Sequence, residues 1–239
     1  MYKRQIQINE LSIPIKRSNR RKSVGISVNR DGSVSVAAPK ECERAKIDEY
    51  VQSKAVWIYQ KLAQRELITS EEVPPKQFVD GSSFWFLGKT YRLLVCNKMP
   101  KQAEGKPLCL DRDRFLIHQE SVSDARECFR RWYVDAGRPI IDRIVEQLGN
   151  RISTPTKIDL RDIGFRWGSC TTEGKILISW RSIQLPMDAL EYVVAHEMVH
   201  LLHRKHDSDF WHQLHKVMPD YVSRKEWLAS NGEKFAAEF

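Results

Sequence analysis

The sequence lacks the features of membrane-spanning and secreted proteins. It has no uninterrupted apolar run near the ~20 residues of a transmembrane helix, and no signal-peptide core follows its first residues. Its cysteines form no CxxC pair and are too few and too scattered for a disulfide framework. They are Cys42, Cys96, Cys109, Cys128 and Cys170. We therefore expect a cytoplasmic protein with reduced thiols and no membrane contact.

Low-complexity segments, internal repeats and extreme composition are also missing. Hydrophobic residues make up 41% of the 239 residues and charged residues 29%, which is ordinary for a soluble globular protein. This composition excludes collagen-like and wholly disordered chains. The length is sufficient for one or two domains with hydrophobic cores of their own.

The charge is distributed unevenly along the chain. Residues 1–65 hold 14 Lys and Arg against 6 Asp and Glu, which accounts for the whole net charge of +8. The densest basic stretch includes Arg17, Arg20 and Arg21. Such a cluster has affinity for phosphates whatever their sequence context, so these arginines are candidate contacts for a nucleotide or nucleic acid. A solvated loop at the entry to a strand is the alternative interpretation.

The first part of the chain has strand-like and helix-like patterns. Alternating apolar residues predict strands at residues 5–8, 24–28 and 34–37. An Asp-Gly pair between the last two predicts a hairpin turn. An apolar stripe predicts a helix over residues 43–66, and adjacent prolines mark residues 70–75 as a linker. We therefore predict an N-terminal β-hairpin and helix region over residues 1–75, carrying the basic excess.

A second region, residues 76–239, mixes strands with longer helices. The predicted elements are a hairpin around Gly88, strands at 115–118, 157–160 and 176–180, and a helix over 122–148. Within that helix, Gly137-Arg138-Pro139 predicts a kink or a break into two helices. Asp188 and Glu191 have the spacing of a capping box and predict the start of the next helix.

Histidine is concentrated near the end of the chain, where six of the seven lie between His196 and His215. His196 and His200 are four residues apart, so they project from one helix face and can share one ion at ~2.0–2.1 Å. Glu197 is placed to take a proton from a metal-bound water. A surface helix with incidental polar residues is the alternative. The flanking apolar residues argue against it, because burying this trio without a partner would cost several kcal/mol.

The third metal ligand is chosen between His206 and His203. On a continuous helix His203 would lie roughly 10 Å along the axis from His196, which is unsuited to closing a tetrahedron. Asp207 can cap a new helix, and a chain reversal before it would return His206 to the metal. We predict His206 as the third ligand and keep His203 as the alternative. The remaining pair, His212 and His215, is predicted on the following helix as solvated or packing residues.

Three nitrogen ligands leave a fourth position for water, which distinguishes a catalytic zinc site from a structural one. We therefore predict one bound Zn²⁺ that lowers the pKa of its water toward ~7. Glu197 would accept the proton and later transfer it to a leaving group. This chemistry is hydrolysis of a polarised bond, and the motif does not specify which bond.

Three separated motifs resemble one known family. The segment from His196 to Trp211 is similar to the signature of the YgjP-like proteins, predicted zinc metallopeptidases related to SprT-like domains. Residues 166–170, Arg-Trp-Gly-Ser-Cys, resemble that family's Trp-Gly-Ser-Cys segment, and residues 17–39 resemble its N-terminal part. The similarity covers roughly residues 12–230, with the motifs in the same order.

The predicted strands and helices together indicate an α+β fold. The resemblance implies that residues 76–239 form a zincin-like metallohydrolase region. It implies zinc ligands at the positions of His196, His200 and His206, with Glu197 as the base. In zincin-like folds a strand beside the metal helix lines the substrate cleft. Trp167, Gly168 and Ser169 precede the strand predicted at 176–180 and are candidate substrate-binding residues that would shape this cleft, for which a tight turn with a packed tryptophan is the alternative. The next residue, Cys170, fits a small buried hydrophobe better than a fourth ligand.

These observations favour a zinc-dependent hydrolase, specifically a metallopeptidase acting on a peptide or protein. The first alternative is a metal-dependent nucleoside triphosphate pyrophosphatase, since the resemblance also implies phosphoanhydride hydrolysis and the basic segment would hold the phosphates. The second is a nucleic-acid-associated module in which zinc is structural, which would require a fourth protein ligand.

Overall fold

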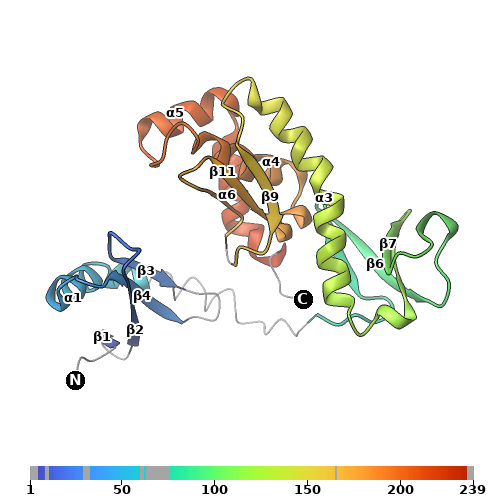
Figure 1. Ribbon diagram of the computed structural model, residues 1–239, viewed down its shortest axis with the longest axis horizontal. Helices are drawn as coiled ribbons and strands as arrows, with labels where there is room; N and C mark the ends of the chain where they lie inside the picture. The colour runs from blue at the N-terminus through green and yellow to red at the C-terminus, as the bar shows by residue number, and fades with distance from the viewer. Residues whose placement is uncertain are drawn as a thin grey trace. The chain divides into compact units, whose positions relative to one another are not determined.

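The computed structural model shows an α+β protein with two compact units, Met1–Pro74 and Pro75–Phe239 (Figure 1). Both units contain strands and helices. The structure describes residues 5–8, 11–28, 33–59, 62, 76–164 and 166–235. Within these ranges, no helix has the length and apolar character needed to cross a membrane.

The first unit is a four-stranded sheet in the order β1-β2-β4-β3, packed against α1. The elements are β1 (Gln5–Ile8), β2 (Leu11–Ser18), β3 (Gly25–Val28), β4 (Val34–Pro39) and α1 (Arg44–Ser53). Strands β3 and β4 pair antiparallel, as predicted for a hairpin, whereas β2 and β4 run parallel. Alternate residues of β1 and β4 are buried with Ile47 and Val51 of α1, because successive strand side chains point to opposite faces.

Two features of this unit differ from the sequence prediction. Strand β2 was not predicted, because Pro14 and the charged residues after it break the apolar alternation. The predicted helix over 43–66 is interrupted, since α1 ends at Ser53 and helical residues resume over 55–59. Parts of three predicted segments lie outside the described residues: the turn at 29–32, most of the helix beyond residue 59 and the linker at 70–75.

The second unit has two sheets, which lie on opposite sides of the long helix α3 (Ala125–Gly149) (Figure 1). The first sheet, in the order β5-β6-β8-β7, comprises β5 (Ser83–Phe86), β6 (Lys89–Cys96), β7 (Leu108–Asp111) and β8 (Arg114–His118). The second, in the order β10-β11-β9, comprises β9 (Lys157–Arg161), β10 (Gly168–Cys170) and β11 (Lys175–Ser179). The predicted β5–β6 hairpin is confirmed, whereas the short strand β7 was not predicted.

Helix α3 runs without interruption through Gly137-Arg138-Pro139, so the predicted break into two helices is wrong. Pro139 removes only one backbone N–H donor from the 25-residue helix. The helix stays continuous because its apolar side chains pack in the core before and after this proline. Gly137 serves packing instead, because a Cβ there would lie 2.6 Å from Cδ1 of Ile183. The glycine therefore lets α3 approach the short helix η3 (Trp180–Gln184) closely.

Three helices follow the second sheet: α4 (Met187–Val199), α5 (Ser208–Val217) and α6 (Tyr221–Asn231). The predicted capping box at the start of α4 is wrong. Pro186 occupies the N-cap position without a side-chain cap, and the Glu191 carboxylate accepts a hydrogen bond from Arg224 of α6 at 2.7 Å. The prediction that Asp207 caps α5 is confirmed, because its carboxylate accepts the backbone N–H of Phe210 at 3.2 Å. The remaining short helices are η1 (Lys101–Ala103), η2 (Gln119–Ser121) and η4 (Gly232–Phe235).

The turn of the β5–β6 hairpin contacts η3 directly in front of α4. The backbone N–H groups of Leu87 and Gly88 donate to the carbonyls of Ile183 and Gln184, both at 3.0 Å. Gly88 has a φ of 78°, and a Cβ there would lie 2.9 Å from Cα of Pro186. Only glycine combines this backbone conformation with this close approach. The turn therefore links the first sheet of this unit to the start of α4.

Candidate metal centre

Three imidazole rings converge at the end of α4. Nε2 of His206 lies 2.9 Å from Nε2 of His196 and 3.1 Å from Nε2 of His200. His196 and His200 come from successive turns at the end of α4, whereas His206 comes from the chain reversal between α4 and α5. The three ligand atoms all lie within 4.8 Å of one another. This arrangement suits ligands that share a single ion.

The chemistry of these three nitrogens fits a bound cation. Nδ1 of His200 lies 2.9 Å from the carbonyl oxygen of His203 and can only donate there, which leaves a lone pair on Nε2. Burial, together with the nearby charges, lowers the pKa of His196 to about 3, and burial also lowers the pKa of His206. Neutral imidazoles each have one lone pair to offer, and one ion placed among the three Nε2 atoms satisfies them together.

The position of His206 follows from the early end of α4. The helix ends at Val199 with His200 as its C-cap, so His203 does not continue the helical stripe. We call His196, His200 and His206 the histidine triangle. The backbone carbonyl of His203, not its side chain, contacts the triangle, through Nδ1 of His200. Its imidazole instead groups with Asp207 and Asp209. The structure thus brings His206, and not the His203 ring, to the other two histidines.

An aromatic pair supports the three histidine rings. Phe210 is fully buried, and its ring centroid lies 4.9 Å from that of His196 and 4.7 Å from those of His200 and His206. Trp211 stacks on His206 at 5.6 Å and donates its Nε1–H to the His206 carbonyl at 3.2 Å. These contacts restrict the orientation of the imidazoles.

Glu197 lies on the side of α4 that faces β10, with only 8% of its surface exposed. Burial raises its pKa to about 7, while the charge of Arg166 and a hydrogen bond from the backbone N–H of Cys170 oppose that shift. A carboxyl group with a pKa in this range can both accept and release a proton near neutral pH.

Gly168 on β10 provides the space for this carboxylate. A Cβ at Gly168 would lie 2.5 Å from Cγ and 2.8 Å from Oε1 of Glu197. The strand can pass this close to the helix only because residue 168 has no side chain. Gly168 therefore has a steric role in the site that the sequence motif alone did not reveal.

The Gly168→Ala variant is expected to displace the Glu197 carboxylate. If Glu197 is the general base, kcat should fall about 10- to 100-fold, the usual effect of a small misplacement of a catalytic group. Zinc content should not change, because the three histidines are not displaced. Steady-state kinetics combined with metal analysis tests this. Gly149→Ala is the matched control, because its Cβ would meet Thr154 only at an ordinary 3.4 Å. An unaltered kcat in Gly168→Ala would contradict the steric role.

Trp167 and Ser169, the neighbours of Gly168 in the chain, make hydrogen bonds to other residues of the protein. The Trp167 carbonyl accepts hydrogen bonds from the backbone N–H of Ser179 at 2.9 Å and from the Ser182 hydroxyl at 3.0 Å. The Trp167 ring is partly buried in the core, and the Ser169 hydroxyl lies 3.2 Å from Nη1 of Arg166. Contact of Trp167 or Ser169 with substrate stays a prediction.

The predicted phosphate-binding arginines, Arg17, Arg20 and Arg21, lie in the first unit and are exposed. The Arg17 guanidinium donates from one nitrogen to three carbonyls, those of Pro39, Lys40 and Cys42 at 3.4, 2.8 and 2.7 Å. Arg21 donates to the Ala37 carbonyl at 3.2 Å. Two of the three guanidinium groups therefore stabilise the end of β4, and phosphate binding by this segment stays a prediction.

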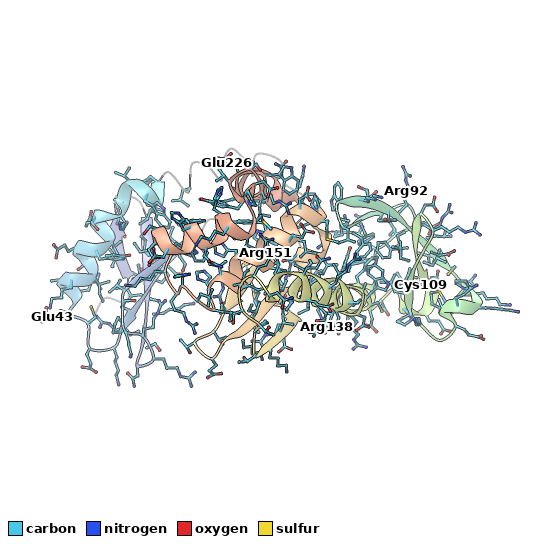
Figure 2. The ribbon with its side chains drawn as sticks, turned by 90° about the horizontal axis from the view of Figure 1, so that it is seen from above. Glu43, Arg92, Cys109, Arg138, Arg151 and Glu226 are labelled. Atoms are coloured by element: carbon cyan, nitrogen blue, oxygen red, sulfur yellow. The ribbon has the colours of Figure 1, made fainter. Side chains whose placement is uncertain are left out.

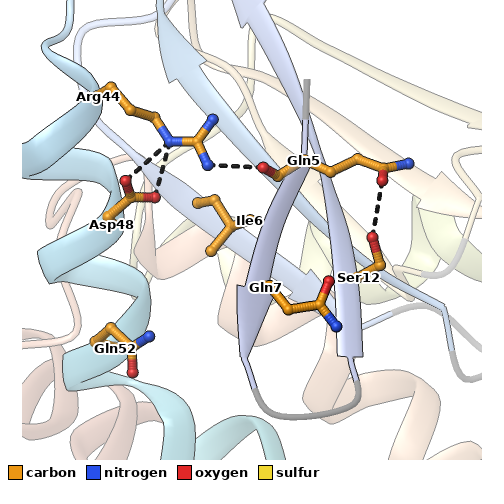
Figure 3. Close-up of a pocket in the computed structure, with 7 residues that line it drawn as sticks. All are labelled: Gln5, Ile6, Gln7, Ser12, Arg44, Asp48 and Gln52. Carbon is orange, nitrogen blue, oxygen red and sulfur yellow. Dashed lines mark hydrogen bonds and ion pairs between the residues drawn. The ribbon is translucent and has the colours of Figure 1, made fainter. Parts of the chain in front are cut away.

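The first unit also has a pocket of about 710 Å³ between β1 and α1 (Figure 3). Its lining is formed by Gln5, Ile6, Gln7, Ser12, Arg44, Asp48 and Gln52. The two charged residues are paired, with Nε of Arg44 2.9 Å from the Asp48 carboxylate, and Arg44 also donates to the Gln5 carbonyl at 2.6 Å. The Ser12 hydroxyl donates to Oε1 of Gln5 at 2.8 Å, so the hydroxyl and the carboxylate of this lining are both engaged within the protein.

Two histidines and a glutamate on one helix, with a third histidine after a chain reversal, are arranged as in metal-dependent hydrolases of the HExxH type. The model of one protein family, described as "YgjP-like, metallopeptidase domain", matches residues 22–231. The chain belongs to this family, as the resemblance of its motifs implied.

Comparison with solved structures gives a weaker likeness. The crystal structure of the metallopeptidase zymogen of Pyrococcus abyssi abylysin is similar over 41% of this chain and 98% of that chain, with 21% identity and a TM-score of 0.36. A likeness at this score carries no argument about the site. No curated protein matches the chain significantly.

Proposed function

We propose that this protein is a zinc metallopeptidase in which His196, His200 and His206 hold one Zn²⁺ and Glu197 is the general base. The observation that carries this proposal is the triangle of three Nε2 atoms, two of them from the end of α4, the helix that also bears the buried Glu197 carboxylate. Zinc bound there would supply a Lewis acid that acidifies water and polarises the carbonyl of the bond to be cleaved.

The surrounding residues prepare Glu197 for proton transfer. The backbone N–H of Cys170 orients its carboxylate, and Gly168 leaves the room that the carboxylate occupies. In this position a carboxylate oxygen of Glu197 takes a proton from the attacking water and then delivers it to the leaving nitrogen. The Phe210 ring excludes water from the inner side of the histidines.

The number of ligands supports a catalytic centre over a structural one. A structural zinc site is closed by four protein ligands, whereas a catalytic site keeps a position open. Among the described residues, the group around His196 contains three ligands, and Cys170 is not one of them. The Cys170 thiol lies 3.5 Å from the Thr171 carbonyl, and burial raises its pKa.

Removal of the metal is expected to lower peptide hydrolysis about 100-fold or more, because the proposed reaction depends on the Lewis acid. Peptide cleavage and pyrophosphate release from a nucleoside triphosphate should be measured on one preparation, before and after chelation and after return of Zn²⁺. Peptide cleavage that zinc restores supports the proposal. Pyrophosphate release without peptide cleavage would identify a nucleotide hydrolase instead. Peptide cleavage that survives complete metal removal would contradict metal dependence.

A further inference from the structure

Two cationic side chains flank the metal centre from different elements. The Lys225 ammonium of α6 lies 4.6 Å from the centroid of the Trp211 ring, which stacks on His206. Arg166, at the entry to β10, has its Nη1 3.2 Å from the Ser169 hydroxyl. Ser169 follows Gly168, the residue in contact with Glu197. Lys225 is therefore on the His206 side of the centre, and Arg166 is on the Glu197 side.

Both positive charges act on the groups of the centre. The charge of Lys225 contributes to lowering the pKa of His196 and that of His206, after burial and the neighbouring histidines. The charge of Arg166 lowers the pKa of Glu197 against the larger opposing effect of burial. Electrostatic effects of this kind fall off with distance and with screening by salt. The two cations therefore contribute to the electrostatics of the metal centre.

Neither cation is held in a close ion pair among the described residues. Both side chains are exposed, and within the described part of the chain no carboxylate forms an ion pair with Lys225 or Arg166. A third cation, Arg204, differs because its guanidinium donates to the carbonyls of Thr171 and Thr172. Two unpaired cations beside the ligands of a Zn²⁺ ion would repel that ion. An anion bound near either cation would reduce this repulsion.

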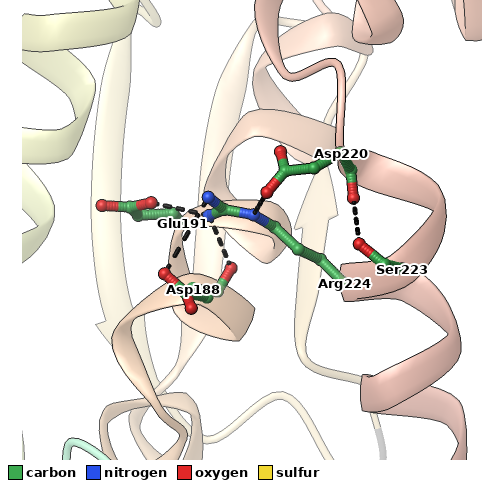
Figure 4. A network of polar contacts seen from close by, with 5 residues as sticks. All are labelled: Asp188, Glu191, Asp220, Ser223 and Arg224. Carbon is green, nitrogen blue, oxygen red and sulfur yellow. Dashed lines mark hydrogen bonds and ion pairs between the residues drawn. The ribbon is translucent and has the colours of Figure 1, made fainter.

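The position of Lys225 is fixed by the residue before it (Figure 4). Arg224 donates to the carboxylates of Glu191 and Asp220, both at 2.7 Å, and to the carbonyl of Asp188 at 3.1 Å. These bonds hold α6 against the first turns of α4, and only 18% of the Arg224 side chain is exposed. Lys225 therefore extends from a helix that is anchored to the metal-binding helix. This distinguishes it from a lysine on a mobile surface segment.

We propose that Lys225 and Arg166 determine substrate specificity by binding an anionic group, carboxylate or phosphate, next to the bond that is cleaved. The inference rests on the proposed hydrolase function and names the substrate class of the same centre. Lysine provides a compact point charge and arginine a planar pair of donors, so either can bind a carboxylate or a phosphate oxygen. The centre therefore selects negatively charged substrates over neutral ones of the same length.

Hydrolysis of matched substrates tests this selectivity. One peptide series carries Gln at all positions, and in its partners Glu replaces Gln one position at a time. ATP provides the phosphate arm. For the natural chain, we expect kcat/KM to be about tenfold higher for at least one Glu peptide or for ATP than for the neutral peptide, the size typical of one charge-assisted contact. Lys225→Glu and Arg166→Glu should each remove this preference.

Two charge reversals elsewhere in the second unit serve as controls. Lys98→Glu and Arg92→Glu change the net charge by the same amount at exposed positions in or after β6. Figure 2 shows Arg92 at the opposite end of this unit from Glu226, the residue that follows Lys225. Both controls should keep the preference for anionic substrates. Its loss in the controls would indicate an effect of total charge and would overturn the assignment to Lys225 and Arg166.

Binding measured without turnover separates this inference from the proposed function. The Glu197→Gln protein is titrated with fluorescently labelled Glu and Gln peptides and with labelled ATP, and anisotropy is followed with and without Zn²⁺. Tighter binding of the Glu peptide identifies a carboxylate ligand, and tighter binding of ATP identifies a phosphate ligand. Equal binding of charged and neutral ligands, or no effect of both charge reversals, would overturn the inference. Charge-selective binding without any hydrolysis by the natural chain would overturn the proposed function alone.

Discussion

The His206→Ala variant is expected to bind zinc about 100-fold or more weakly than the natural chain, because a three-nitrogen site becomes a two-nitrogen site. The His203→Ala variant should bind zinc almost as well as the natural chain. The His203 contact with the centre is made by its backbone carbonyl, which alanine retains. Elemental analysis of the purified proteins and competition with a chromogenic chelator measure the difference.

His212→Ala provides a matched control, since His212 is exposed on α5 and does not belong to the histidine triangle. Thermal unfolding of each metal-free variant shows whether the substitution has altered folding itself. Equal zinc loss from His206→Ala and His203→Ala would contradict the ligand assignment. Loss confined to His203→Ala would reverse it.

The Glu197→Gln variant is expected to retain zinc while kcat falls about 10²- to 10⁴-fold, the usual contribution of a general base. Glutamine has the same shape as glutamate, and its carbonyl oxygen can still accept the Cys170 N–H. It cannot accept the proton of the attacking water. Measurement of kcat on zinc-loaded protein, with the metal content determined on the same sample, tests the two halves of this expectation together.

Glu146→Gln is the control for this experiment. Glu146 is exposed on α3, and its substitution removes the same charge at a position outside the metal centre. Full activity of zinc-loaded Glu197→Gln would rule out Glu197 as the base. Loss of zinc from that variant would show that the carboxylate contributes to metal binding. In either result the division of roles between Glu197 and the histidines would need revision.

The local part of the centre could be predicted from the sequence. His196 and His200 share a helix face because of their four-residue spacing, and this relation needs no knowledge of the rest of the fold. The return of His206 depends on where α4 ends. No glycine or proline occurs between Val199 and Asp207 to mark that end. The capping signal of Asp207 for the next helix was the sequence feature that indicated the reversal.

The features that the sequence did not reveal depend on long-range contacts. Glu191 has the spacing of a capping residue, but Arg224, 33 positions later, binds it and leaves the N-terminus of α4 without that cap. The closeness of Gly168 to Glu197 likewise joins a strand and a helix that are separated in the chain. Periodicity reports which face of an element is buried, but not which element lies against it. The α+β class was predicted correctly because it depends on the periodicities alone.

The hydrogen bonds from the β5–β6 turn to η3 couple the start of α4 to a sheet that contributes none of the three converging histidines. Fraying of α4 from its first turn would have to displace Pro186 from Gly88 and disturb two backbone hydrogen bonds of the hairpin. Local opening of the helix is therefore coupled to opening of the hairpin. A metal bound to His196 and His200 would therefore stabilise the β5–β6 hairpin, as well as α4, against local unfolding.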